Sequence, residues 1–220
     1  MPRMRFEKTG DSVWISHLDL MRVFQRSFCR AGIPIYHSQG YNPRAYVSIA
    51  LPLPVGMASV CELLDFELAE GVQVALSEIP ARLNAVMPRD IRVLTCYDGG
   101  KKLRELCYLD ARVNLEYDRG IPEDAAEQMA AFFQEPSILV TKRGKKGPVE
   151  LDIAPMLRGV SVEEQGPGEL ALRCRVCAQN PALNPMLLVE ALRCHRPRVA
   201  PDFASACRLE ILDGEEQPFR

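Results

Sequence analysis

Hydrophobic and polar residues alternate along residues 3–10, and this two-residue period predicts a first strand. Residues 16–32 follow a helical period instead. Their apolar positions recur at intervals of three and four, at Leu18, Met21, Phe24 and Phe28. We expect this helix to begin at Ser16, whose hydroxyl can cap it together with Asp19, and to end at Gly32.

Extended and helical patterns continue through the first half of the chain. Residues 33–38 and 45–52 are expected to be strands, and residues 62–70 either continue the second of these or resume it after a bulge. A helix over 74–88 and a strand over 91–98 follow. Strand, helix, strand, strand, helix, strand is the ferredoxin-like order, which folds as an antiparallel sheet with two helices on one face.

The second half repeats this order of elements without a detectable repeat in sequence. The expected elements are a strand over 107–117, a helix over 122–135, hairpins over 137–153 and 160–177, a helix over 184–193 and a strand over 205–213. We therefore predict an α+β protein of tandem ferredoxin-like (βαββαβ) units with antiparallel sheets. The first domain spans residues 1–98, and the second spans residues 105–214 and carries a basic hairpin at 141–148.

Charge is unevenly distributed along the chain. Residues 1–60 contain seven Lys and Arg against three Asp and Glu, although the whole chain has 27 against 29. This local excess favours an anion-binding first half, whereas solvated surface charge explains any single residue equally simply. No stretch approaches the 18 apolar residues of a membrane span, so we expect a soluble cytoplasmic protein in which the eight cysteines are reduced.

The residues that could support metal or cofactor chemistry are poorly spaced for it. Cys174 and Cys177 form a Cys-x-x-Cys pair, but in an alternating strand a separation of three puts their side chains on opposite faces. We expect neither a metal site nor a bound cofactor. The chain also lacks a phosphate-binding P-loop, a Rossmann glycine fingerprint and the Cys-x₃-Cys-x₂-Cys triplet of radical S-adenosylmethionine (SAM) enzymes.

Two features of the first half are compatible with nucleic-acid binding. Arg22, Arg26 and Arg30 recur every four residues along the first helix, where they either follow phosphates or simply form a solvated face. The segment 39–44 combines side chains that can contact bases, sugars and phosphates: Gln39, Tyr41, Asn42 and Arg44. The same composition also suits an ordinary β-turn.

A third basic feature lies in the second half. The tip of the hairpin at 141–148 carries two glycines and four cations, namely Lys142, Arg143, Lys145 and Lys146. It can be interpreted as an arm over a phosphate backbone or as a solvated loop.

His17 is the one candidate for acid–base catalysis. It shares the first turn of the predicted helix with Asp19, but two residues apart on a helix the two side chains point away from each other. A catalytic His17 would therefore need another partner, and Arg44 or Tyr41 could serve.

The run from "SHLDLMR" to "SQGYNPRAYVSIALPLPVG", followed by "ELLDFEL", resembles the radical-SAM-linked family, a domain of unknown function found alone or fused to radical SAM proteins. The similarity is specific over residues 6–68 and weaker through "TKRGKKGPVELDI". The positions that match the family's motif are Ser16, His17, Asp19, Arg22, Arg30, Ser38, Gln39, Gly40, Asn42, Pro43, Pro52, Pro54 and Gly56. The resemblance implies a separate radical SAM protein as partner and, because family genes lie near RNA-processing genes, a role linked to RNA.

Three hypotheses remain open at this point. The first is an RNA-binding accessory module for RNA modification or processing, in which Arg22, Arg26 and Arg44 hold phosphates. The second is a metal-independent RNA-cleaving or RNA-modifying enzyme that uses His17. The third is a protein-interaction domain that docks a radical SAM enzyme.

Overall fold

The computed structural model describes residues 1–144 and 147–220. These residues form two compact units, one of residues 1–103 with Arg220 and one of residues 104–219. The predicted Lys145 and Lys146 lie outside the described residues, as does the side chain of Arg143. The domain limits 1–98 and 105–214 stay a prediction.

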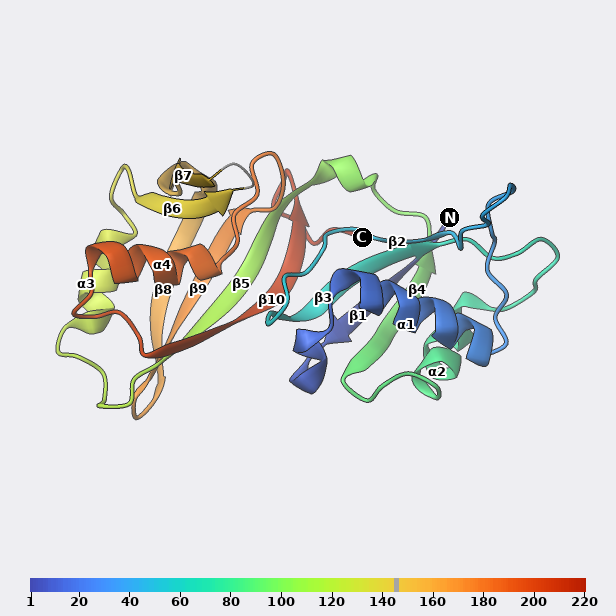
Figure 1. Ribbon diagram of the computed structural model, residues 1–220, viewed down its shortest axis with the longest axis horizontal. Coiled ribbons are helices and arrows are strands. Elements are labelled where there is room, and N and C mark those ends of the chain that lie inside the picture. The colour runs from blue at the N-terminus through green and yellow to red at the C-terminus, as the bar shows by residue number, and fades with distance from the viewer. Residues whose placement is uncertain (145–146) are drawn as a thin grey trace. The chain divides into compact units, whose positions relative to one another are not determined.

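The first unit contains β1 (Pro2–Lys8), α1 (His17–Arg30), β2 (Val47–Ile49), β3 (Ala58–Phe66), α2 (Ile79–Asn84) and β4 (Ile91–Asp98). Strand β1 pairs with β4 on one side and β3 on the other, β2 pairs with the far edge of β3, and all pairs are antiparallel. Helices α1 and α2 cover one face of this sheet (Figure 1). The order β4-β1-β3-β2 with both helices on one side is the ferredoxin-like arrangement.

The core of this unit follows from the alternation in β1. Met4 and Phe6 are fully buried under the helices, and the ring of Phe6 meets Phe24 of α1 edge to face with centroids 4.7 Å apart. Phe28, one turn further along α1, packs 5.0 Å from Phe66 of β3. These aromatic contacts hold the apolar side of α1 against the sheet and so fix which side of the helix remains accessible.

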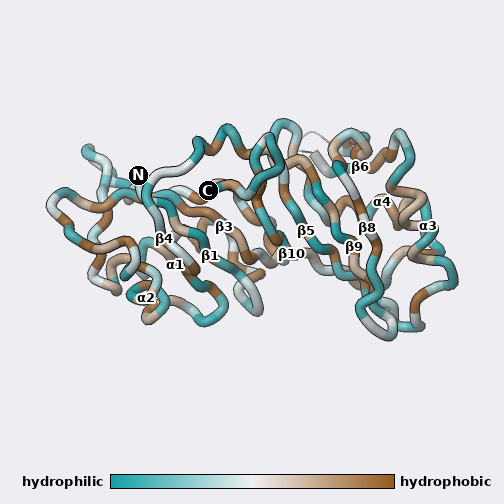
Figure 2. Tube along the Cα trace, turned by 180° about the vertical axis from the view of Figure 1, so that it is seen from behind, coloured by the Kyte–Doolittle hydropathy of each residue, from teal (hydrophilic) through white to brown (hydrophobic). Residues whose placement is uncertain are grey.

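The second unit contains β5 (Leu106–Glu116), α3 (Ala125–Phe132), β6 (Leu139–Gly144), β7 (Gly147–Asp152), β8 (Leu157–Gly166), β9 (Glu169–Cys177), α4 (Met186–His195) and β10 (Phe203–Asp213). Its sheet runs β10-β5-β9-β8, again antiparallel, with α3 and α4 on one face (Figure 1). The β6–β7 hairpin pairs only with itself in a two-stranded sheet among the described residues. Figure 2 shows hydrophobic and hydrophilic residues alternating along β5 and β9.

Both units therefore have the ferredoxin-like strand order, and the predicted α+β class with tandem antiparallel units is confirmed. The hairpin β6–β7 is an insertion between the first helix and the second strand of the second unit. Short 3₁₀ helices connect some of the elements, at Gly10–Trp14, Leu76–Glu78, Leu103–Glu105 and Ala154–Met156.

Three sequence-based expectations in the first unit were wrong in detail. Residues 33–38 form isolated bridges instead of a strand, because Pro34 has no N–H to donate to a ladder. The strand expected over 45–52 is reduced to the three residues of β2. The helix expected over 74–88 is α-helical only in α2, which begins beside Pro80 after a 3₁₀ turn.

Candidate functional site

The N-terminus of α1 is fixed by hydrogen bonds among three polar side chains, Ser16, Asp19 and Arg22. Ser16 is the N-cap, and its hydroxyl oxygen accepts a hydrogen bond from the Asp19 backbone N–H at 3.2 Å. The hydroxyl in turn donates to the Asp19 carboxylate at 2.7 Å, and Arg22 binds the same carboxylate at 2.8 Å. The bond from Ser16 and then the one from Arg22 lower the pKa of Asp19 below its usual value. Arg22 is therefore exposed but held close to the helix start.

Two parallel rows of side chains run along the accessible part of α1. Residues spaced by four lie in one row on a helix, and neighbouring residues differ by about 100° around its axis. The first row borders a groove and consists of Met21, Gln25 and Cys29. The second row lies about 100° further round and consists of the exposed Arg22, Arg26 and Arg30. The predicted arginine row therefore flanks the groove.

The segment 38–44 forms a loop that is closed at its base by two hydrogen bonds between Ser38 and Arg44, one of them to the Ser38 hydroxyl. The Ser38 N–H donates to the Arg44 carbonyl at 2.9 Å, and the Arg44 N–H donates to the Ser38 hydroxyl at 3.0 Å. Tyr41, at the far end, is 99% exposed, and Gln39 and Asn42 beside it are also exposed. The loop therefore presents a ring and two amides to solvent on a defined base.

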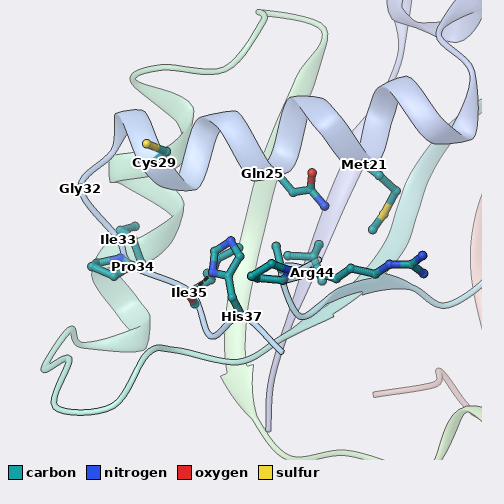
Figure 3. A pocket seen from close by; sticks show the side chains of 12 residues that line it. Met21, Gln25, Cys29, Gly32, Ile33, Pro34, Ile35, His37 and Arg44 are labelled. Atoms are coloured by element: carbon teal, nitrogen blue, oxygen red, sulfur yellow. Dashed lines mark hydrogen bonds between the residues drawn. The ribbon is translucent and has the colours of Figure 1, made fainter. Parts of the chain in front are cut away.

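A groove of about 820 Å³ lies between α1 and the segment that runs from Gly32 to Val47. Its wall is mostly apolar, and Ile33, Ile35 and Val47 form the buried part of it. Figure 3 shows the side chains of Met21 and Gln25 pointing from α1 toward Arg44 and His37. The groove thus combines an apolar wall with a few polar groups, which is typical of small-ligand sites.

The hydrogen-bonding capacity of the groove comes from two residues that the sequence pattern did not single out. His37 places Nδ1 3.0 Å from the Ile35 carbonyl, and because a carbonyl only accepts, the neutral ring carries its proton on Nδ1. In this neutral form of the ring, Nε2 is an acceptor. Gln25, on α1, has an amide that makes no hydrogen bond to any residue of the described part of the chain.

The structure brings together part of the predicted site. Arg44 lines the groove, and Arg22 and Arg26 flank it on α1. Gln39, Tyr41 and Asn42 lie on the loop next to Arg44 and outside the groove wall. Lys142 is exposed on β6 of the second unit.

His17 is the first residue of α1, and the row that borders the groove continues to it through Met21. Its Nδ1 is enclosed and makes no hydrogen bond within residues 1–144 and 147–220. His17 does not line the groove. In the part of the chain that the structure describes, this Nδ1 nitrogen thus makes no hydrogen bond to either of the suggested partners of His17, Tyr41 and Arg44.

The cysteine pair considered as a metal site lies within β9. Cys174 is buried and its thiol donates to the Ala111 carbonyl, and burial raises the pKa of this thiol to about 12. Cys177 is only half-buried. Among the described residues no three His, Cys, Asp or Glu side chains form a group that could bind a metal ion. No helix in the same residues has the length and apolar character to cross a bilayer.

The sequence matches the model of one protein family, and the fold resembles that of solved structures. A family model described as "Uncharacterized protein conserved in bacteria (DUF2344)" matches residues 2–185. No curated protein matches the sequence.

Two solved structures resemble the whole chain in fold. A chain of the "Crystal Structure of a Cbf5-Nop10-Gar1 Complex" is 12% identical with a TM-score of 0.52, and the match covers 96% of this chain and 48% of that one. A chain of the "Structure of H/ACA RNP bound to a substrate RNA containing 2'-deoxyuridine" is 9% identical with a TM-score of 0.51, covering 98% of this chain and 48% of that one. This protein thus spans about half the length of each neighbour, and at these identities the likeness concerns the fold.

Proposed function

This chain belongs to the family described as "Uncharacterized protein conserved in bacteria (DUF2344)". From the geometry of the candidate site, we propose that it is an RNA-binding accessory module for RNA modification or processing. One observation carries the proposal. The side chains of Gln39, Tyr41, Asn42 and Arg44 are exposed beside one groove and make no hydrogen bond or ion pair to the residues that the structure describes. Polar groups and a ring held outward in this way are available to a partner.

The chemistry of these side chains fits single-stranded RNA better than it fits a protein surface. Single strands are bound by cations that follow the phosphates and by rings on which bases stack, and unstacked bases are read through hydrogen bonds to their edges. Arg22, Arg26 and Arg44 supply the cations, and Tyr41 supplies the ring. Of the seven Lys and Arg among the first 60 residues, Arg3 and Lys8 are buried, so the attraction of this unit for a polyanion comes from the exposed arginines of α1 and from Arg44.

The fold comparison is consistent with an RNA-related role. One structural neighbour is titled as a ribonucleoprotein bound to a substrate RNA, so the fold occurs in an RNA-bound assembly. The similarity of the sequence to the radical-SAM-linked family adds a partner to the proposal, a separate radical SAM enzyme to which the module presents its RNA. Co-purification of such an enzyme that disappears after nuclease treatment supports presentation through RNA, and co-purification that survives it supports direct docking.

The central test is RNA binding at several salt concentrations. Fluorescence anisotropy with a labelled single-stranded RNA should give an affinity that falls with salt, since bound cations release counterions. The double variant Arg22→Ala/Arg26→Ala should bind more weakly and with a logarithmic salt slope smaller by about 1.4, because each phosphate contact to a single strand contributes about 0.7.

The matched control removes the same charge from β4 and the turn before it in the first unit. Arg92 is exposed on β4 between the buried Ile91 and Val93, so it points away from the helices, and Arg89 is exposed just before this strand. Arg89→Ala/Arg92→Ala should keep the wild-type slope. Equal affinity and slope for the wild type and for Arg22→Ala/Arg26→Ala would refute RNA binding at this surface.

A further inference from the structure

We infer that the groove of the first unit holds one unstacked nucleotide of the bound RNA, with its base against the apolar wall and its phosphate at Arg44. This inference rests on the proposed function and adds to it that a single nucleotide is the part of the RNA that the groove recognises. It assigns roles to Gln25 and His37, which lie in the groove between the arginine row and the loop.

The dimensions and the wall of the groove suit a nucleobase. Its volume of about 820 Å³ lies within the range of roughly 300–1,000 Å³ that is usual for sites that enclose small organic ligands. Ile33, Ile35 and Val47 are buried members of the apolar core and form the floor of the groove. The apolar surface that is still open to water comes from the half-buried Met21 on α1 and from the exposed Pro34 and Pro43. A flat, weakly hydrated ring removes this apolar surface from water without leaving a charge buried.

The polar groups of the groove match the edge of a base. The Gln25 amide offers one donor group and one acceptor, and His37 offers Nε2 as an acceptor because its Nδ1–H is committed to the Ile35 carbonyl at 3.0 Å. Amide side chains pair with adjacent donor and acceptor atoms on base edges. An unstacked base that is read in this way is the usual target of proteins that recognise RNA sequence.

The charges around the groove match the RNA backbone. Arg44 lines the groove and its side chain extends toward Met21, so it can bind the phosphate next to the enclosed base (Figure 3). The exposed Arg26 lies on the neighbouring row of α1, outside the groove, where the adjoining phosphate of a longer strand would pass. A free mononucleotide has the same base and phosphate but cannot reach this second cation, so length distinguishes the two ligands.

Cys29 makes occupancy of the groove measurable in the unmodified protein. It is exposed and lines the groove, whereas the exposed Cys194 lies on α4 of the second unit. Alkylation with N-ethylmaleimide, followed by mass spectrometry of the peptides, reports both thiols in one sample. Addition of a single-stranded RNA trinucleotide at saturation should slow labelling of Cys29 at least fivefold and leave Cys194 unchanged. Uridine or adenosine monophosphate at the same concentration should protect Cys29 much less.

A pair of matched substitutions tests the base contact. Gln25→Met keeps the length and helix propensity of the side chain but removes its amide, and should weaken trinucleotide binding about five- to tenfold, as expected for one lost hydrogen-bonding group. Gln128→Met makes the same change at an exposed position of α3 and should have no effect. A salt slope equal to that of the wild type in Gln25→Met would show that the phosphate contacts remain.

The outcomes separate this inference from the proposed function. RNA binding that depends on Arg22 and Arg26 while Cys29 labels at its free rate would overturn the nucleotide site and leave the RNA-binding function intact. Protection of Cys29 by mononucleotides but not by RNA would also overturn it, in favour of a free small ligand. If the protein binds no RNA at all, both the proposed RNA-binding function and the nucleotide site are refuted.

Discussion

Tyr41 offers the sharpest separation of a binding role from a folding role. Its side chain is 99% exposed, and the loop that carries it is closed by hydrogen bonds of 2.9 and 3.0 Å between Ser38 and Arg44, one of them to the Ser38 hydroxyl, that do not involve the ring. Tyr41→Ala should therefore change the free energy of unfolding by less than about 0.5 kcal/mol. If the ring stacks on a base, the same substitution should weaken RNA binding by about 1–3 kcal/mol, which is roughly five- to 150-fold.

The assay combines urea unfolding with fluorescence anisotropy on the same variants. Tyr41→Trp keeps a flat ring and should retain binding, whereas Tyr41→Leu keeps apolar area without a ring and should bind as poorly as Tyr41→Ala. Phe203→Ala removes a comparably exposed ring, 60% accessible, from β10 of the second unit and serves as the control. Equal RNA affinity for the wild type and Tyr41→Ala, at unchanged stability, would refute stacking at this loop.

Two further predictions concern how the first unit is held together. Asp65→Ala removes the carboxylate that Arg3 binds at 2.6 and 3.0 Å, in a pair whose side chains are each 6% exposed. It should lower the free energy of unfolding by about 3–5 kcal/mol in urea, and a loss below about 1 kcal/mol would contradict a buried, coupled pair. Ser16→Ala removes the cap bond to the Asp19 N–H and should cost about 1 kcal/mol near pH 7. The pKa of Asp19 is lowered in the folded state, so this carboxylate stabilises the fold above its unfolded pKa, and the contribution is lost as the pH falls through the folded pKa. The cost of Ser16→Ala should therefore be smaller in acid. A cost that does not change with pH would contradict this coupling between Ser16 and Asp19.

The fold was predictable because the helices and strands of each unit have clear local signals in the sequence, such as apolar spacing and helix caps. The apolar spacing of α1 and its cap at Ser16 depend only on neighbours within one turn, so the sequence alone placed both ends of this helix within two residues. The second unit was recognisable from element order, with β5, β9 and β10 close to their expected limits. The limits of the helix expected over residues 74–88 were harder to predict. Pro80 has no N–H to donate, and the α-helical part begins beside it.

The site was only half visible in the sequence for a physical reason. Arg44 and Tyr41 could be identified because charge and aromatic character in a turn stand out against a polar loop. Gln25 and His37 could not, since each has an ordinary composition and becomes distinctive only when α1 and the segment after it face each other across the groove. The nearest signal in the sequence was the four-residue spacing that joins Met21 to Gln25 and Cys29.

The groove exists because the chain does not complete the strand that the alternation of residues 33–38 predicts. Gly32 turns the chain away from the end of α1 with φ at +64°, and Pro34 and Pro43 then supply no N–H to a ladder. Isolated bridges, from Ile35 to Leu68 and from His37 to Ala45, join this segment to its neighbours in place of a ladder. Gly32, Pro34 and Pro43, which keep this segment irregular, all line the groove, and Pro43 also lies within the "SQGYNPR" stretch that carries the proposed RNA contacts.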